Sequence, residues 1–163
     1  MQNFILHTPT KILFGQDQIA GLAQQIPADA RILITYGGGS VKKNGVLDQV
    51  YAALAGRNVQ EFSGIEPNPT YETLMKAVEV VRAENIDFLL AVGGGSVVDG
   101  TKFIAAAAHY QADADPWHIL KTVGSEIKGA VPMGCVLTLP ATGSESNSGA
   151  VITRNSSGDK QHF

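Results

Sequence analysis

The sequence is poor in cysteine and has no long apolar run. Cys135 is the only cysteine among the 163 residues, so the chain cannot form an internal disulfide bond, which favours a reducing compartment. The N-terminal residues MQNFILHTPT have neither the basic start nor the apolar stretch of a secretion signal. Every apolar run is far shorter than the roughly 18 residues expected of a membrane-spanning helix. We therefore expect a cytoplasmic protein that does not bind a membrane.

Positive charge is also scarce, and no residues stand out as a hydrolytic or metal centre. The 12 Lys and Arg residues are scattered along a chain with a formal net charge of -3, so nucleic acid is not an expected partner. We interpret Cys135 as an inert buried thiol and Trp117 as a packing residue, and Ser144 lacks the G-x-S-x-G context of a hydrolase nucleophile. The histidines show no spacing of four along a helix, which excludes a metal site built from adjacent pairs. They are His7, His109, His118 and His162.

What the chain does contain is a repeated glycine segment. The two copies are Gly37-Gly38-Gly39-Ser40 and Gly93-Gly94-Gly95-Ser96, and each follows a short apolar run and precedes a helical pattern. Residues 31–43 align on residues 87–99 without gaps, at an offset of 56 and with five consecutive identities. Unpaired N–H groups, the helix dipole and missing Cβ atoms make such a strand-to-helix turn an anion site. Either copy alone would be interpreted as a tight turn, but together they indicate a ligand with two phosphate-like parts.

Strands and helices alternate along most of the sequence. Continuous apolar runs such as residues 32–36 and 88–92 are typical of strands buried between helix layers. The alternation predicts an α/β, Rossmann-like fold with a mostly parallel sheet, helices on both faces and an N-terminal edge strand or hairpin. With 44% hydrophobic residues, residues 1–163 fit a single domain. The other expected elements are helices over residues 19–26, 47–54, 69–85 and 96–110, and strands over residues 10–14, 59–63, 132–139 and 151–153.

The glycine segments resemble two known nucleotide-binding motifs but match neither of them. Lys42 and Val98 occupy the third glycine position of G-x-G-x-x-G in the two copies, so the ordinary dinucleotide fingerprint is absent. From Gly95, the sequence differs from the phosphate-binding loop of NTPases by inverting its lysine and hydroxyl residue, here Thr101-Lys102. Neighbouring helix residues point about 100° apart, so the inversion redirects both groups. An NTPase is therefore the weaker interpretation.

Two features beside the second glycine segment are open to two interpretations each. Asp99, three residues after Ser96, is either half of a capping box or a carboxylate that faces a ligand hydroxyl. Residues 138–146 (TLPATGSES) contain four hydroxyl residues and a carboxylate, directly after a predicted strand. This segment is either a solvated connection, which its composition favours, or a loop that binds a polar ring or amide, which its place at a strand end supports.

The segments GGGSVVDGTKFIAAAA, DPWHIL and PMGCVLTLPATGSESNSGAVIT resemble the N-terminal domain of the iron-containing alcohol dehydrogenases. The resemblance covers the whole chain, including LHTPTKILFG and GIEPNPT, and points to the NADPH-dependent bacterial aldehyde reductases and butanol dehydrogenases. It implies reversible hydride transfer between NAD(P)H and an aldehyde or primary alcohol, with a divalent metal, Fe or Zn, as the Lewis acid. We expect a homodimer.

The resemblance also implies a set of cofactor-binding residues. The second glycine segment would bind the diphosphate, Asp99 would lie on the nicotinamide side, and Asn68 and Pro69 near the adenosine end. Thr138, Thr142 and Ser144 would surround the nicotinamide and its ribose. The implied set is Gly37, Gly38, Gly39, Ser40, Asn68, Pro69, Gly93, Gly94, Gly95, Ser96, Asp99, Thr138, Thr142, Ser144 and Lys160.

The first glycine segment implies a choice of cofactor. Relatives that prefer NAD carry an aspartate at the position of Gly39, where it bonds the ribose 2′-hydroxyl. Gly39 removes that charge, Ser40 offers a hydroxyl, and Lys160 matches a family lysine near the 2′-phosphate. The resemblance therefore implies NADP(H) as the cofactor.

One difference from the family concerns length. Family chains are more than twice as long, and their metal ligands, an aspartate and histidines, lie in a C-terminal helical domain that this sequence does not contain. We therefore expect no catalytic residue and no metal ligand within residues 1–163, weak cofactor binding, and no aldehyde reduction by this chain alone. The alternatives are a non-catalytic nucleotide-binding fragment, or an NAD- and metal-dependent enzyme like dehydroquinate synthase, against which the TLPATGSESNS loop argues.

Overall fold

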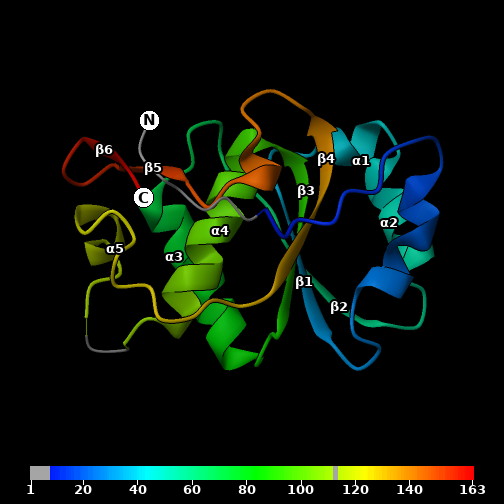
Figure 1. The fold of residues 1–163 in the computed structure, drawn as a ribbon, viewed down its shortest axis with the longest axis horizontal. Coiled ribbons are helices and arrows are strands. Elements are labelled where there is room, and N and C mark those ends of the chain that lie inside the picture. The colour runs from blue at the N-terminus through cyan, green and yellow to red at the C-terminus, as the bar shows by residue number, and fades with distance from the viewer. Residues whose placement is uncertain (1–7, 112–113) are drawn as a thin grey trace, which may run out of the picture.

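The computed structural model describes residues 8–111 and 114–163, which form a parallel sheet between two layers of helices (Figure 1). The strands are β1 (Arg31–Tyr36), β2 (Asn58–Phe62), β3 (Phe88–Gly94), β4 (Met133–Leu139), β5 (Val151–Arg154) and β6 (Asp159–His162). The α-helices are α1 (Ser40–Lys43), α2 (Val46–Ala53), α3 (Tyr71–Ala83), α4 (Gly95–His109) and α5 (His118–Lys121), and the 3-10 helices are η1 (Gln18–Gln25) and η2 (Ser144–Ser146). The main sheet has the order β2-β1-β3-β4 with every pair parallel, and β5 and β6 form an antiparallel hairpin. The expected α/β, Rossmann-like fold is confirmed.

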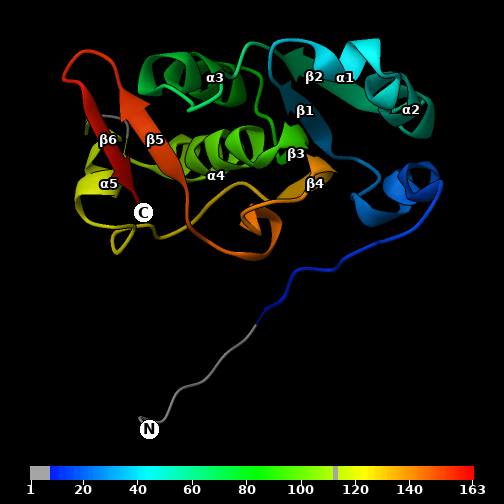
Figure 2. The same cartoon turned by 90° about the horizontal axis from the view of Figure 1, so that it is seen from above.

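Each central strand feeds two hydrophobic cores because its side chains alternate between the two faces of the sheet. Leu33 and Leu89 contribute to the core under α3 and α4. Ile34 and Leu90 contribute to the core under η1, α1 and α2. Figures 1 and 2 show these helix layers on opposite sides of the strands. Burial on both faces explains why these strands are continuous apolar runs in the sequence.

The N-terminal edge strand is not present in the described residues. Residues 8–14 form no strand, and Ile12 and Phe14 leave 67% and 96% of their surfaces exposed. The rest of the predicted strand or hairpin lies outside the described residues. The antiparallel pair occurs instead near the C-terminus, as β5 and β6. An apolar stretch such as TKILF has strand propensity, but a strand also needs a neighbour to hydrogen-bond with.

One predicted helix start and one predicted turn are also wrong. Asn68 does not cap α3, because it has a left-handed φ of 60° and the chain turns there; Thr70 is the cap, and its Oγ1 accepts from the N–H of Thr73 at 3.4 Å. At the second glycine segment, β3 continues through Gly94 and α4 begins at Gly95, so the expected turn is absent. Among residues 8–111 and 114–163, no helix combines the length and apolar character needed to cross a bilayer.

Candidate functional site

The two glycine segments lie next to each other at the carboxyl ends of β1 and β3. These strands are neighbours in the sheet, with β2 on the outer side of β1 and β4 on the outer side of β3. The chain therefore leaves β1 toward one edge of the sheet and leaves β3 toward the other. This is the topological switch point, where ligands of such sheets bind beyond the strand ends.

The sequence repeat is also a structural repeat. Leu33 pairs with Leu89 and Tyr36 with Val92, so the strand register equals the offset of 56 between the two copies. The methyl group of Val97 connects them: an added Cβ on Gly93 would lie 2.7 Å from its Cγ2, and one on Gly37 would lie 3.7 Å away. The absence of side chains at these two glycines therefore lets the strand ends and α4 pack together closely.

The first glycine segment is an open turn. Gly39 has a φ of 100° and caps the four-residue helix α1, a conformation that side chains rarely adopt. Added Cβ atoms on Gly38 or Gly39 would meet nothing within 4 Å, and Ser40 is exposed. The space beside these residues is available to a ligand.

The second glycine segment presents the start of a long helix. Gly94 caps α4 without a side-chain hydrogen bond, so the first N–H groups of the helix have no partner within it. The helix has 15 residues, and its dipole adds partial positive charge at this end. A Cβ on Gly95 would lie 3.2 Å from Thr142 Oγ1, which places the loop after β4 over the helix start. These features suit an anionic ligand group.

Asp99 is not half of the capping box that was considered for it. The capping box is absent, because Ser96 lies inside α4 and the cap residue is Gly94. One carboxylate oxygen of Asp99 accepts from the hydroxyl of Ser144, and the other accepts from the N–H of Val151 at 3.1 Å. Asp99 thus joins α4 to the loop after β4 and to β5.

The loop after β4 is anchored to α4, not simply solvated. Thr138 and Thr142 are exposed, whereas Ser144 leaves only 3% of its surface accessible. Lys102 donates to Ser144 Oγ at 2.9 Å, to Asn147 Oδ1 at 2.9 Å and to the Gly149 carbonyl oxygen at 2.7 Å. A loop with this many fixed contacts has a defined shape at the end of its strand.

The inverted pair Thr101-Lys102 has an explanation unrelated to NTPases. The Thr101 hydroxyl points into the core, where its Oγ1 lies 2.6 Å from Thr35 Oγ1 and 2.7 Å from the Val97 carbonyl oxygen. Lys102, one residue on, points to the loop after β4. Neither side chain is arranged like its counterpart in a phosphate-binding loop.

Asn68, Pro69 and Lys160 lie together on the other side of the site. Lys160 Nζ on β6 donates to Asn68 Oδ1 at 2.8 Å, and the Thr153 N–H on β5 donates to the Pro69 carbonyl oxygen at 3.0 Å. The segment 64–65 in turn bonds to the end of β1, with the Ile65 N–H 3.2 Å from the Tyr36 carbonyl oxygen. The segment before α3 therefore bonds to the end of β1 at one end and to the hairpin at the other.

Sequence reasoning missed Lys102 and Asn147 as organising residues. Lys102 was considered only as a phosphate ligand, and Asn147 was not singled out. The spacing of Asp99 and Lys102 was a usable signal, because residues three apart lie on the same face of a helix. No pattern in the sequence indicated which loop that face would meet.

Trp117 packs as expected, whereas Cys135 is only partly buried. Trp117 is buried and its ring lies 5.5 Å from that of Tyr71. Burial raises the pKa of the half-buried Cys135 thiol, which disfavours the reactive thiolate. The described residues contain no group of three or more His, Cys, Asp or Glu side chains that could hold a metal ion. A divalent metal therefore does not fit residues 8–111 and 114–163 by themselves.

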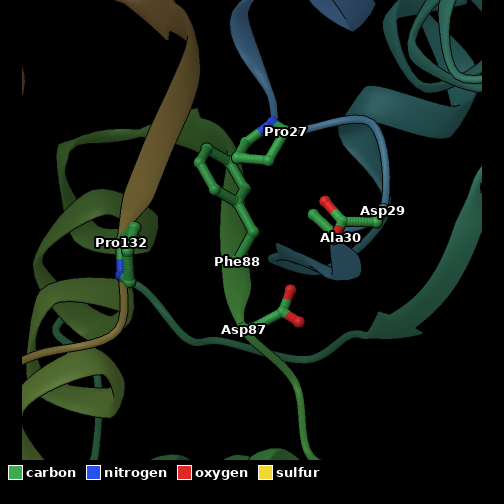
Figure 3. Close-up of a pocket in the computed structure, with 6 residues that line it drawn as sticks. All are labelled: Pro27, Asp29, Ala30, Asp87, Phe88 and Pro132. Carbon is green, nitrogen blue, oxygen red and sulfur yellow. The ribbon is translucent and has the colours of Figure 1, made fainter.

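A hollow of about 400 Å³ opens at the opposite end of the strands (Figure 3). Its lining includes Phe88, Asp87 and Ala30, which lie at or before the amino ends of β1 and β3. Ligands of parallel sheets bind beyond the carboxyl ends, so we do not assign a cofactor to this hollow.

Comparison with known proteins gives consistent matches. A family model described as iron-containing alcohol dehydrogenase matches residues 9–163. The chain is 73% identical over 163 residues to the NADPH-dependent aldehyde reductase YqhD of Escherichia coli K12, covering all of this chain and 42% of that protein. It is 51% identical over 156 residues to the probable NADH-dependent butanol dehydrogenase 1 of Bacillus subtilis, covering 94% of this chain and 40% of that protein.

A solved structure matches as well. The crystal structure of YqhD from E. coli K-12 superposes with a TM-score of 0.98 at 73% identity, covering 99% of this chain and 41% of that one. The chain thus spans about two fifths of the length of the relatives that it matches.

Proposed function

The chain belongs to the iron-containing alcohol dehydrogenase family, and we propose that it forms the NADP(H)-binding domain of an enzyme that transfers hydride between NADPH and an aldehyde or primary alcohol. The observation that carries this proposal is the pair of glycine segments, in register on neighbouring strands at the switch point of the sheet. Each segment offers backbone N–H groups without side chains in front of them. NADP(H) carries a diphosphate and a separate 2′-phosphate, which matches two such segments.

We assign the diphosphate to the second segment, where Gly93, Gly94, Gly95 and Ser96 lead into α4. The adenosine end with its 2′-phosphate would lie beside the first segment, near Gly37, Gly38, Gly39 and Ser40. Asn68, Pro69 and Lys160 support this end, because Lys160 brings a positive charge to within 2.8 Å of Asn68. The nicotinamide half would lie by the loop after β4, with Thr138 and Thr142 exposed beside it.

Asp99 and Ser144 take a different role in this proposal from the one that the family resemblance implied. Their polar atoms bond to each other and to neighbouring groups of the chain, so they shape the nicotinamide end more than they contact it. The bound cofactor supplies the hydride, and these residues of the chain bind and orient it. The described residues offer no metal ligand cluster, so the Lewis acid of a complete enzyme, Fe or Zn, would be held elsewhere.

We further propose that the chain works in the cytoplasm as part of a homodimer. The single cysteine supports a reducing compartment. The exposed apolar side chains of residues 12–14 support association with a second copy, because such side chains are usually covered. Light scattering of the purified chain tests the dimer, and a monomer at micromolar concentration would contradict it.

Calorimetric titration of the chain with NADPH, NADH and ATP tests the main proposal. We expect NADPH to bind most tightly of the three. ATP binding as tightly as NADPH, or no binding of any dinucleotide, would refute it.

A single added methyl group tests the diphosphate position. A Cβ on Gly94 would lie 3.9 Å from Leu139 Cβ, an ordinary contact, and Gly94 has an unstrained φ of -89°. Gly94→Ala should therefore keep the fold but weaken NADPH binding by about tenfold, roughly 1.4 kcal/mol, by filling space that the diphosphate needs. Gly21→Ala in η1 is the matched control, because its Cβ would meet nothing within 4 Å. Equal NADPH affinities in the two variants would place the diphosphate elsewhere.

A further inference from the structure

Lys102 is the centre of the polar contacts between α4 and the loop after β4. Its ammonium group donates to three acceptors, Ser144 Oγ, Asn147 Oδ1 and the Gly149 carbonyl oxygen, at 2.7 to 2.9 Å. An ammonium group has three N–H donors and no acceptor. All three donors of Lys102 are therefore used by the chain itself, and the side chain cannot also bind a phosphate without losing one of these bonds.

The acceptors of Lys102 extend its effect through the loop. Asn147 Oδ1 also accepts from the Gly149 N–H at 3.0 Å, and Asn147 Nδ2 donates to the Gly143 carbonyl oxygen at 3.0 Å. Ser144, held by Lys102, donates in turn to Asp99. One lysine thus fixes both ends of the segment from Gly143 to Gly149.

The Lys102 side chain is partly removed from water, so its hydrogen bonds to the chain replace bonds to water. Lys102 is half-buried, and burial lowers its pKa while the nearby charge of Asp99 opposes that effect. A desolvated ammonium group needs its hydrogen-bond partners, because each one replaces a lost bond to water. The loop is therefore tied to α4 more firmly than a surface lysine could tie it.

The tied loop begins over the anion-binding end of α4. Thr142, just before the segment that Lys102 holds, lies 3.2 Å from the Cβ position of Gly95. Release of residues 143–149 would free Thr142 and the loop from the helix start. The part of a ligand that lies by this loop would then lose a preformed wall.

We propose that Lys102 is a positioning residue that preforms the nicotinamide half of the cofactor site by holding residues 142–149 against α4. This inference rests on the proposed function. Lys102 acts through the loop and does not contact the cofactor. The adenosine half of the site, formed by the first glycine segment with Asn68 and Lys160, does not depend on it.

Binding of two probes to the full chain tests the inference. The probes are NADPH and adenosine 2′,5′-bisphosphate, which lacks the nicotinamide half. Lys102→Met should weaken NADPH by about tenfold, because several charge-assisted hydrogen bonds that shape the loop are lost, and should change the affinity of the bisphosphate by less than about twofold. Lys102→Arg retains a multiple donor and should recover part of the NADPH affinity and of the fluorescence change that NADPH shows on binding. Lys76→Met, which removes an exposed lysine of α3, is the matched control.

Each outcome decides one claim. Equal weakening of both probes in Lys102→Met, or no weakening of either, would overturn the positioning role. If the unaltered chain binds neither probe, the proposed function itself fails. Hydrogen exchange without ligand then still tests the local claim, because the N–H groups of Ser146 and Gly149 are hydrogen-bonded within the loop and should exchange faster in Lys102→Met. Unchanged exchange would show that Lys102 does not hold the loop.

Discussion

The two glycine segments share the residues Gly-Gly-Gly-Ser-Val, yet the fold uses them differently. In the first, β1 ends at Tyr36, and Gly39, with a φ of 100°, starts a helix of four residues. In the second, β3 continues through Gly94, and α4 extends from there for 15 residues. The first is an open turn and the second is a strand that leads directly into a helix.

The two copies also direct the chain to opposite faces of the sheet. Val41 and Val97 occupy the same position in the repeat, but Val41 is buried in the core under α1 and α2, and Val97 in the core under α3 and α4. Right-handed crossovers toward opposite edges of a sheet require helices on opposite faces. Local sequence therefore specifies two glycine-rich strand ends, and the order of the strands decides how each is built.

The largest expected effect on this comparison comes from Gly93→Ala. The new Cβ would lie 2.7 Å from Val97 Cγ2 and 3.0 Å from Val97 Cβ, and a β-branched side chain on a helix has little freedom to turn away. Overpacking of this kind costs about 1–3 kcal/mol of unfolding free energy. Urea denaturation of the purified variant measures the loss.

The matched substitution in the first segment is Gly38→Ala. Its Cβ would meet nothing within 4 Å, so the unfolding free energy should stay within about 0.5 kcal/mol of the original value. If both alanines destabilise the chain equally, the two segments are not packed as differently as the structure has them.

The next effect in size tests whether the first glycine segment binds the 2′-phosphate of the cofactor. Gly39→Asp would add a carboxylate at the open turn, where we place the 2′-phosphate, and aspartate tolerates a left-handed conformation better than most residues. Charge repulsion should lower the affinity for NADPH relative to NADH by about tenfold, or roughly 1.4 kcal/mol. Titration with the two cofactors gives the ratio, and an unchanged ratio would remove the 2′-phosphate from this turn.

A third, smaller effect tests how β1 is joined to α4. Thr35 aligns with Ala91 in the repeat, and its buried hydroxyl lies 2.6 Å from that of Thr101 on α4. Thr35→Val keeps the shape and removes this hydrogen bond, so we expect a loss of about 1 kcal/mol in unfolding free energy. Ala91→Val introduces the same side chain at the equivalent position of the other copy, where there is no hydroxyl to lose.

The outcome for Ala91→Val is expected to have a different cause. Ala91 is fully buried, so any loss there reflects added volume and not a missing hydrogen bond. Another substitution at this position, Thr35→Ser, keeps the hydroxyl. It should retain the part of the unfolding free energy that Thr35→Val loses with the hydrogen bond. A Thr35→Ser variant no more stable than Thr35→Ala would contradict this account.

The parts of the structure that sequence predicted are those determined locally. The buried strands 32–36 and 88–92, the helix over 47–54 and the carboxyl-end position of both glycine segments follow from apolar periodicity and chain order. The N-terminal strand was wrong because pairing depends on a partner that residues 8–14 do not have among the described strands. The predicted helix start at residue 69 was wrong, because Asn68 adopts a left-handed conformation and α3 begins only at Tyr71, after its cap Thr70.

The candidate site was predicted in its backbone but not in its side chains. Glycine positions identify where a ligand can approach, since missing Cβ atoms leave the backbone open. The partners of Asp99 and Lys102 lie more than 40 residues away in the chain, in a loop whose path no local pattern describes. Long-range polar contacts of this kind depend on the packed fold.

The smallest expected effect concerns the hairpin that carries Lys160, whose ammonium group donates to Asn68 Oδ1. The Glu72 carboxylate on α3 accepts from the N–H groups of Asn155 and Ser156 in the β5–β6 turn, at 3.2 and 3.0 Å. Burial opposes ionisation of Glu72, but these backbone hydrogen bonds outweigh it and lower its pKa below the ordinary 4.5. The contribution of Glu72 to stability is therefore present above pH 4.5 and is lost as the pH falls through the lower folded pKa, because the unfolded chain takes up the proton first.

Glu72→Gln should remove this pH-dependent contribution while preserving most of the shape of the side chain. The loss at pH 7 should be about 0.5 kcal/mol or less, since solvent screens a partly exposed carboxylate. Glu79→Gln changes an exposed glutamate of the same helix and is the control. Because the hairpin carries Lys160, Glu72→Gln should also weaken NADPH slightly more than NADH. If the ratio of NADPH to NADH affinity does not change, the hairpin belongs to the fold but does not contribute to the adenosine half of the site.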